Sequence, residues 1–292
     1  MGNEKTTKIN QLIRKWSRGT VATASYLKRQ GFTYDLLTKY RRSGWIKSFG
    51  QGAYILPEDR VEWPGALYAV QSQLELEVHA GGKTALELKG YGHYVPEGTR
   101  TLFLYAQPKV ILPAWFSGER LGLSLVVTRT SLFPGNTYEG FSEWEEREFS
   151  IRISSPERAA MEMLYLVPEK VSFEESLLIM ESLVTLRPEV VQELLGMCRF
   201  VKVKRLFMYM AEKHRHPWVE KLDLSRIAFG KGKRRIVSGG ELNPKYNITV
   251  PREQREGTAS HPQADLRARS FRNVFRAQVR GCRRSHCRGC LH

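Results

Sequence analysis

The order of elements in the first sixty residues constrains the fold more than any other feature of the chain. In residues 8–16 apolar side chains recur at i, i+3, i+4 and i+7, which predicts a first amphipathic helix. Thr20 can cap a second helix over residues 21–30, and Thr33 can cap a third over residues 34–43. We therefore expect three short helices before the first strand.

A short β-hairpin is predicted directly after these helices. Residues 45–49 and 53–56 are strand-like, and the intervening Gly50-Gln51-Gly52 fits a tight turn. Three helices followed by a small hairpin make up a winged helix-turn-helix, in which the last helix enters the major groove of DNA.

The predicted third helix has an apolar side and a polar side. Leu36, Leu37 and Tyr40 recur at helical spacing and are expected to face the interior. Small polar groups suit base edges, whereas cations suit phosphates. The predicted DNA-binding residues are Lys28, Thr33, Tyr34, Thr38, Lys39, Arg41, Arg42, Lys47 and Gln51. A protein-docking module built from the same elements is the alternative at this point.

The net charge also favours an anionic partner. The chain of 292 residues carries +16 at pH 7 and has a pI of about 9.8, and Lys and Arg bind phosphates by displacing counterions. No stretch approaches the roughly 18–20 apolar residues of a membrane span, and no signal-peptide core follows the N-terminus. Net charge alone does not separate DNA from RNA or anionic lipid as the partner. We expect a cytoplasmic protein without a membrane span.

The predicted fold class is α+β, with a winged helix-turn-helix followed by a mixed α/β domain. The expected division is a winged unit over residues 1–60, a linker helix over 61–76, an α+β domain over 77–251 and a basic, disordered tail over 252–292. Helices in the α+β domain are predicted over residues 83–88, 156–166, 172–183, 188–197 and 200–214. Strands are predicted over residues 101–106, 123–129, 149–153, 223–229, 235–237 and 246–250.

Two clusters of cations in the C-terminal half predict a second basic surface. They are Lys202, Lys204 and Arg205 on a predicted helix, and Lys231, Lys233, Arg234 and Arg235 in a loop that contains glycine. Both clusters could hold the phosphates of DNA or RNA, or face a protein partner, and a solvated face without a ligand is the alternative. Nucleotide binding is not expected, because the spacing around Gly230 does not match a P-loop.

Candidate catalytic and metal-binding motifs are weak. Glu87-Leu88-Lys89 has a form found in metal-dependent nucleases. Such a site also needs an upstream acid on a neighbouring strand, whereas the glycine-rich region 81–93 is predicted to be helix and turn. Cys198 has apolar neighbours and is predicted to lie in the core. The tail contains possible zinc ligands, but only one closely spaced cysteine pair, whereas a closed structural zinc site usually has two such pairs. These ligands are Cys282, Cys287 and Cys290, with His286 or His292. We predict no enzyme activity, cofactor or metal, with a metal-dependent nuclease as the alternative.

Several segments together resemble the AbiEi-type antitoxins of type IV toxin–antitoxin systems. Besides the winged N-terminus they are GGKTALELKGYGHYV at 81–95, SSPERAAMEMLYLVP at 154–168, the basic stretch at 201–240 and KYNITVP at 245–251. The resemblance implies an autorepressor that binds inverted repeats upstream of its own operon, as a monomer or a dimer, with cooperativity on the DNA.

The same resemblance implies an antitoxin activity for the C-terminal domain. It would neutralise a nucleotidyltransferase-like toxin of an abortive-infection-like operon, so the cognate toxin or its RNA substrate is a further expected partner. Members of this family usually end near the position of Pro251. The arginine-rich tail beyond it departs from the family pattern, and the resemblance assigns it no role.

Overall fold

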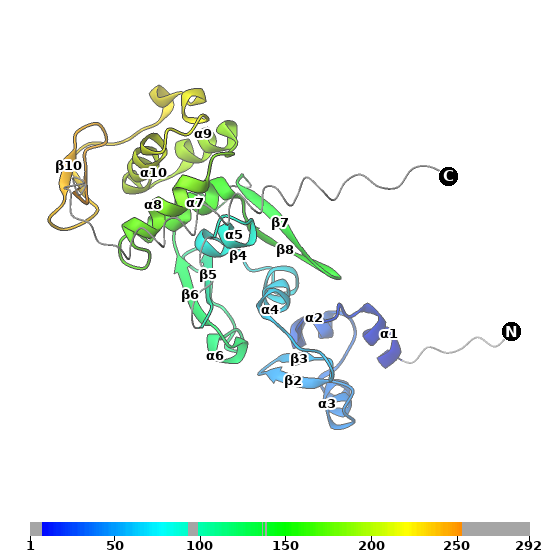
Figure 1. Ribbon diagram of the computed structural model, residues 1–292. Coiled ribbons are helices and arrows are strands. Elements are labelled where there is room, and N and C mark those ends of the chain that lie inside the picture. Colours follow the sequence, from blue (N-terminus) through cyan, green and yellow to red (C-terminus); the bar gives the residue numbers. More distant parts are fainter. Residues whose placement is uncertain (1–7, 93–98, 136, 138, 253–292) are drawn as a thin grey trace, which may run out of the picture. The chain divides into compact units, whose positions relative to one another are not determined.

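The computed structural model describes residues 8–92, 99–135, 137 and 139–252. The compact unit of the chain ends at Pro251, and the cysteine-containing tail predicted after it lies outside the described residues. None of the described helices has the length and apolar character that crossing a bilayer requires. The fold is α+β, with a winged helix-turn-helix at the N-terminus and a mixed α/β domain after it, as predicted (Figure 1).

The winged unit contains three helices and a three-stranded sheet. They are α1 (Lys8–Lys15), β1 (Ala22–Thr23), α2 (Ala24–Arg29), α3 (Tyr34–Arg42), β2 (Lys47–Gly50) and β3 (Ala53–Ile55). The sheet is antiparallel in the order β1-β3-β2. Gly31 and Gly44 have φ of +87° and +75°, so each provides the left-handed residue that ends α2 and α3. The three helices and the hairpin are confirmed, but the expectation that all three helices precede the first strand is wrong, because β1 lies between α1 and α2.

The predicted start of the second helix is wrong. The cap of α2 is Thr23, whose Oγ1 accepts a hydrogen bond from the Tyr26 amide at 3.3 Å. The hydroxyl of the predicted cap, Thr20, instead donates to the Ser17 carbonyl at 2.6 Å. Residues 22 and 23 are extended because they pair with β3, where Ala22 lies opposite Tyr54.

A connecting segment joins the winged unit to the rest of the chain. It consists of α4 (Trp63–Tyr68) and the π-helix η1 (Ala69–Gln73), and it lies where the linker helix is predicted. The buried Gln73 side chain fixes this segment to β1, since its Oε1 accepts from Thr23 N and its Nε2 donates to Val21 O, both at 2.8 Å. Gln71 Nε2 binds the carbonyls of Val78 and Arg152 in the next sheet.

A five-stranded mixed sheet forms the centre of the α/β domain. Its strands are β4 (Val78–Ala80), β5 (Thr101–Ala106), β6 (Ser124–Arg129), β7 (Phe141–Glu146) and β8 (Phe149–Ser154). The order is β6-β5-β4-β8-β7, with β5–β6 and β4–β8 parallel and the other two pairs antiparallel. Strands β5, β6 and β8 agree with the prediction, whereas β4 and β7 were not predicted.

The sheet separates two hydrophobic cores. On β5, Leu102 and Leu104 pack on the side of α4 and the winged sheet, where Phe49 belongs to the same core. Phe103 and Tyr105 alternate with them and pack on the opposite side. That side is covered by α5 (Gly82–Leu88) and α7 (Pro156–Tyr165), and α6 (Gly118–Leu121) lies between β5 and β6 in sequence.

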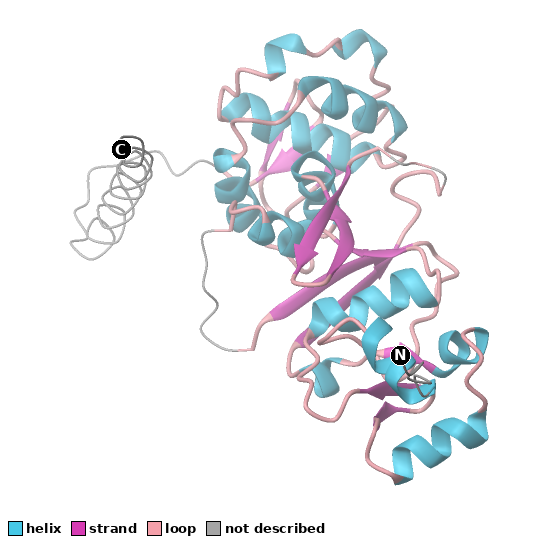
Figure 2. Cartoon of the chain, turned by 90° about the vertical axis from the view of Figure 1, so that its right-hand side faces the viewer, coloured by secondary structure: helices cyan, strands magenta, loops and turns pink. Residues whose placement is uncertain are grey.

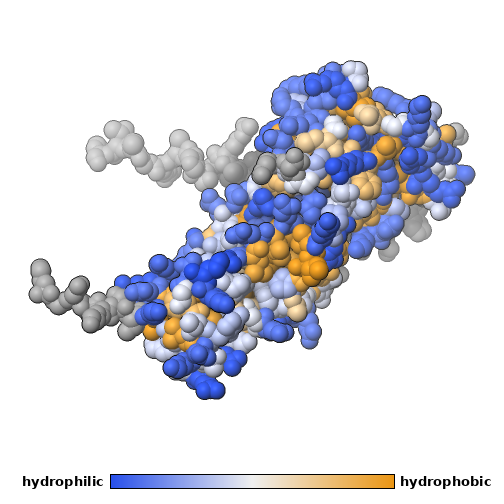
Figure 3. Space-filling model, turned by 180° about the vertical axis from the view of Figure 1, so that it is seen from behind, coloured by the Kyte–Doolittle hydropathy of each residue, from blue (hydrophilic) through white to orange (hydrophobic). Residues whose placement is uncertain are grey.

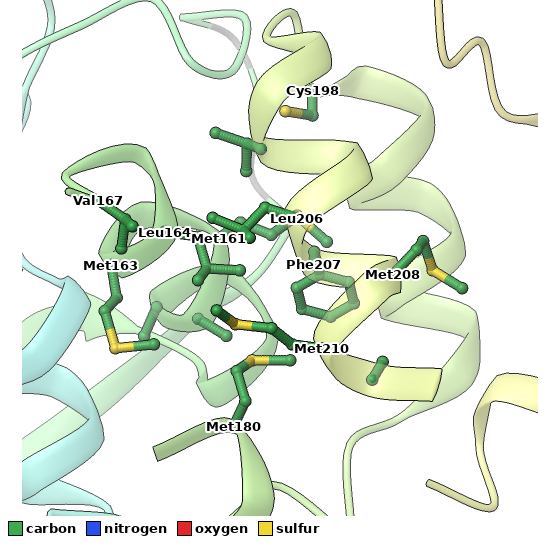
Figure 4. Packing of buried hydrophobic residues seen from close by; sticks show 14 of the residues in the cluster. Met161, Met163, Leu164, Val167, Met180, Cys198, Leu206, Phe207, Met208 and Met210 are labelled. Atoms are coloured by element: carbon green, nitrogen blue, oxygen red, sulfur yellow. The ribbon is translucent and has the colours of Figure 1, made fainter. Parts of the chain in front are cut away.

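A helical layer completes the second core. Its helices are α8 (Phe173–Ser182), α9 (Pro188–Met197) and α10 (Val201–Lys213), and their bounds are close to the predicted ranges. Helices gather at one end of the large sheet in Figure 2. Figure 4 shows Met161 of α7 meeting Phe207 and Met210 of α10 between the two helices. Cys198 is 2% exposed in this core, as predicted, and burial raises the pKa of its thiol to about 11.

Short elements close the domain. They are the 3₁₀ turns η2 (Val219–Lys221) and η3 (Leu224–Arg226), and the strands β9 (Arg234–Arg235), β10 (Glu241–Asn243) and β11 (Ile248–Val250). These strands form a separate sheet in the order β10-β11-β9. The strand predicted over residues 223–229 is wrong, because Asp223 caps a 3₁₀ turn through its hydrogen bond from Ser225 N.

Candidate nucleic-acid interface

Helix α3 faces the core of the winged unit with its apolar side and solvent with its polar side. Leu37 is 1% exposed, and Leu36 and Tyr40 are half-buried against the same core. Thr33 caps the helix, because its Oγ1 accepts a hydrogen bond from Leu36 N at 3.3 Å. The predicted division of this helix into two sides is confirmed.

Tyr34 and Lys28 lie together at the start of α3. The Tyr34 side chain is 60% exposed, and Lys28 Nζ of α2 lies 5.9 Å from the centre of its ring, within range of a cation–π contact. An exposed aromatic ring and an ammonium group therefore lie together at the helix start, from which helix-turn-helix proteins contact base edges.

Cations surround the outer side of α3. Residues 8–57 contain ten Lys and Arg but only one acidic residue, Asp35. Lys39, Arg41 and Arg42 are exposed, and in the described part of the chain no ion pair involves them. Their charges are thus available to an anionic partner. Thr38, in contrast, is half-buried.

The β2–β3 hairpin has one solvent face and one covered face. Gln51 is exposed at the turn, and the exposed Lys47 donates from Nζ to the Pro57 carbonyl at 2.7 Å. Phe49 points the other way, where its ring meets Trp115 edge-on at 6.1 Å. The wing therefore offers fewer free groups than the helix.

Trp45 is an exposed aromatic residue next to α3 that was not among the predicted binding residues. It follows Gly44, immediately after α3, and is 47% exposed. Apolar side chains also gather in the middle of one face of the molecule (Figure 3). The sequence pattern placed Trp45 in a strand-like run, in which an aromatic side chain is read as buried.

The prediction that Lys202, Lys204 and Arg205 on α10 form part of a second basic surface is wrong. Lys204 and Arg205 are only 5% and 3% exposed, and Lys202 is half-buried. Each uses its charge internally, because Lys202 Nζ donates to the carbonyls of Tyr165 and Val167 and Lys204 Nζ donates to that of Ala228. Burial lowers the pKa of Lys202. The Lys202 and Lys204 side chains thus bind backbone carbonyls of neighbouring segments and do not form a solvent-facing surface.

The loop part of that surface remains exposed. The Arg205 guanidinium donates to the carbonyls of four loop and turn residues at 2.6–3.2 Å, which holds the loop against α10. The acceptors are Phe229, Gly230, Gly232 and Asn247. The exposed cations are Lys231 and Lys233 on the loop, and Arg234 and Arg235 in β9. Their role as a binding surface stays a prediction.

A buried polar network lies between β4, β8 and α7. The Glu162 carboxylate accepts from His79 Nε2 at 2.8 Å, from Arg158 Nε at 2.9 Å and from Ser154 Oγ at 2.7 Å. Burial alone would raise the pKa of Glu162, but these partners lower it to about 2. Burial lowers the pKa of His79, so its imidazole is neutral at pH 7 and donates its Nε2 proton.

Glycine is required beside this network. A Cβ atom on Gly81 would lie 2.1 Å from Glu162 Oε2, and the Gly82 amide donates to the same oxygen at 3.1 Å. The two glycines that begin GGKTALEL thus allow the backbone to approach the Glu162 carboxylate closely. Sequence reasoning missed this network, because its members are separated by about eighty residues.

The SSPER segment builds a second buried carboxylate cluster. Glu157 is 2% exposed and accepts from Ser155 Oγ at 2.6 Å and from Arg187 Nε and Nη2 at 2.9 and 3.0 Å. Burial would raise the pKa of Glu157, but these hydrogen bonds lower it to about 2. The contacts of Glu157 with Ser155 and Arg187 therefore give this segment a structural role.

The candidate nuclease residues lie at the end of α5. Glu87 is half-buried, and burial raises the pKa of its carboxyl. Lys89 follows the helix, and its Nζ is 3.5 Å from the Glu143 carbonyl. Among the described residues, no group of three His, Cys, Asp or Glu side chains could hold a metal ion. The nuclease hypothesis is untested, and the cysteine ligands of the tail lie outside the described residues.

Two family models match this chain. The model described as a transcriptional regulator, the AbiEi antitoxin of a type IV toxin–antitoxin system, matches residues 99–251. The model of the AbiEi antitoxin N-terminal domain of such regulators matches residues 5–97. No curated protein matches the chain.

A solved structure has the same fold. The crystal structure of the RV2827C protein from Mycobacterium tuberculosis is 16% identical to this chain, with a TM-score of 0.50. The match covers 82% of this chain and 88% of that one. The two family models together match the winged unit and the α/β domain, so the resemblance found in the sequence is confirmed. The chain therefore belongs to the AbiEi antitoxin family of transcriptional regulators from type IV toxin–antitoxin systems.

Proposed function

We propose that this antitoxin binds double-stranded DNA upstream of its own operon and represses transcription there. The observation that carries the proposal is the exposed outer side of α3, whose cations have no ion-pair partner in the described chain. Two copies bind the inverted repeats cooperatively, as monomers or as a dimer, in the cytoplasm.

The side chains of this interface have two roles. Thr33, Tyr34 and Thr38 contact base edges, and they supply hydroxyl groups that donate and accept hydrogen bonds. The cations hold the phosphate backbone and add no sequence information. They are Lys28, Lys39, Arg41, Arg42 and Lys47, and Gln51 contributes from the turn of the wing.

The antitoxin activity is assigned to the α/β domain. We infer that this domain neutralises a nucleotidyltransferase-like toxin encoded beside it. The exposed cations Lys231, Lys233, Arg234 and Arg235 face the toxin or its RNA substrate. The hydrogen bonds of Arg205 support this assignment, because they fix the loop backbone while the four cationic side chains remain in solvent.

An anisotropy titration tests the DNA-binding proposal. The full chain is titrated onto labelled DNA from upstream of its own gene, with scrambled DNA as competitor at physiological salt. We expect tight, cooperative retention of the upstream DNA by the native chain and loss of binding in R41Q/R42Q. The variant K231Q/K233Q is the matched control, because it removes two exposed cations from the other surface. Equal binding of upstream and scrambled DNA would contradict the proposal.

Co-expression with the neighbouring toxin gene tests the antitoxin proposal. K231Q/K233Q is expected to lose growth rescue, whereas R41Q/R42Q is expected to keep it. Rescue lost in the α3 variant and retained in the loop variant would assign neutralisation to the winged unit instead.

A further inference from the structure

A pocket of about 160 Å³ lies between the helix-turn-helix and the connecting segment. Its apolar floor consists of Leu12 and Leu27 of α1 and α2, together with Trp16, and all three are buried. Tyr68 and Ser72, from α4 and η1, form another part of the lining. The pocket therefore takes its walls from the winged unit and from the segment that joins this unit to the central sheet.

The lining selects for a flat ligand with a negative charge. Trp16, Tyr26 and Tyr68 provide aromatic surface, and Lys15 is the one charged side chain among the described residues that line the pocket. An apolar cavity of about 150 Å³ is large enough to hold benzene, so a single aromatic ring fits this volume. A ring packs favourably against other rings, and an ammonium group attracts a carboxylate.

We propose that this pocket binds a small single-ring aromatic carboxylate. The ring packs against Trp16 and the neighbouring tyrosines, and the carboxylate lies at the rim beside Lys15. Polar groups from Gln30 and Ser72 also line the pocket and are exposed, so the carboxylate end remains partly hydrated.

The position of the pocket couples it to the recognition helix. Gln30 and Phe32, in the turn between α2 and α3, belong to its lining. Gln73 also lines it and holds β1 through two hydrogen bonds of 2.8 Å. It lies in the π-helix η1, and π-helical turns are frequent at functional sites. Occupation of the pocket should therefore change DNA affinity, and DNA should change ligand affinity by the same factor.

Calorimetry on the full chain without DNA tests the site itself, with benzoate as the probe. We expect saturable binding at one site. Benzyl alcohol has the ring without the charge, acetate has the charge without the ring, and each is expected to bind about tenfold more weakly than benzoate. Equal binding of benzoate and acetate, or no saturable binding of benzoate, would overturn the proposal.

Variants place the ligand in the pocket. K15Q is expected to weaken benzoate binding and leave benzyl alcohol binding unchanged, whereas R14Q on the same helix should alter neither. S72F puts a ring into the mouth of the pocket and should prevent binding of both aromatic probes, while its melting temperature shows that the chain is folded. Benzoate binding that is unchanged in both K15Q and S72F would also overturn the site.

The regulatory consequence rests on the proposed DNA binding and is tested separately. Anisotropy titrations with upstream DNA are repeated at saturating benzoate, and we expect the DNA dissociation constant to shift in the native chain but not in S72F. An unchanged constant in the native chain would refute the coupling. If the chain binds no upstream DNA, the DNA proposal fails, while calorimetry still decides the pocket.

Discussion

At the scale of single residues, charge in this protein is used in two distinct ways. Cations on α3 are exposed without ion-pair partners in the described chain, whereas the buried Arg158 and Arg205 each donate to several acceptors inside the fold. Buried charges require such partners, because an unpaired charge in a core is strongly destabilising. Net charge alone therefore overstates the surface that is available for a nucleic acid.

Arg41 and Arg42 should control the salt dependence of DNA binding. Each phosphate contact contributes about 0.9 to the slope of log affinity against log salt. R41Q and R42Q should each weaken binding to every DNA sequence and reduce that slope by about 0.9. Y34F should instead reduce the difference in affinity between upstream and scrambled DNA and leave the salt slope unchanged. Anisotropy across a salt series measures both effects, and equal slopes for all three variants would refute the division of roles.

Removal of the Glu162 charge should destabilise the chain strongly. E162Q takes one partner from a buried ionic network and leaves the Arg158 guanidinium without its carboxylate, a change that typically costs about 3–5 kcal/mol. Urea unfolding measures the loss. E193Q on the exposed side of α9 is the control and should change the unfolding free energy by less than about 0.5 kcal/mol. A similar small effect for E162Q would show that the network is not needed for stability.

At the scale of elements, helices with clear caps and apolar periodicity were predicted well. The Thr33 cap and Gly44 define α3, and Pro at the first position defines α7 and α9. Strand β1 was missed because two residues show no alternation, and its partner β3 is thirty residues away. Strand β7, with the sequence FSEWEE, was missed because its acidic residues are unfavourable in strands.

The candidate interface shows the same limit of sequence reasoning. The two sides of α3 follow from helical spacing, so its outward residues could be named in advance. The internal use of Lys202, Lys204 and Arg205 could not, since it depends on backbone carbonyls brought close by the tertiary fold. A run of cations on a helix does not reveal whether the side chains meet solvent or carbonyl oxygens.

Gly50 should be intolerant of any side chain. A Cβ atom there would lie 2.6 Å from Trp115 Cβ, so G50A forces the wing away from the loop that precedes α6. We expect a loss of about 1–3 kcal/mol in unfolding free energy. G196A is the control, because no atom lies within 4 Å of the added Cβ in α9 and alanine favours helices. Thermal melts that rank G50A at or above the native chain would contradict this packing.

At the scale of the whole molecule, two buried histidines and one half-buried histidine, His214, make stability depend on pH. Burial lowers the pKa of His79, His214 and His216, whereas an unfolded histidine titrates near 6.5. Their contribution is therefore complete above pH 6.5 and decreases as the pH falls, by up to about 1.4 kcal/mol per pH unit for each histidine. Glu157 and Glu162, with pKa values of about 2, extend the loss below pH 4.5.

Urea titrations from pH 8 to pH 5 check this dependence. The midpoint should be constant above pH 6.5 and should fall below it. H216Q keeps a donor for the Met180 carbonyl, which His216 Nε2 contacts at 2.7 Å, but cannot titrate. This variant should show a smaller fall than the native chain. A midpoint that rises on acidification would reverse the sign of the argument.

Separation of the winged unit at residue 60 should destabilise it. Val21, Phe49 and Ala53 belong to the same core as Trp115, Phe116 and Ile151 of the α/β domain. A fragment of residues 1–60 exposes these side chains to water and should melt below the full chain. Circular dichroism melts of both proteins measure the difference. An equal melting temperature would mean that the predicted boundary at residue 60 separates independent folding units.

The three-stranded winged sheet is covered on both sides, by its own helices through Ile46 and Leu56 and by the α/β domain through Phe49 and Ala53. The residues that we propose to bind DNA and the residues that pack against the α/β domain are thus different sets. For the design of regulators with new targets, a graft limited to the outward positions of α3 should leave the framework intact. A whole winged unit transplanted from a relative must also match the residues that meet Trp115, or the chimaera will not assemble.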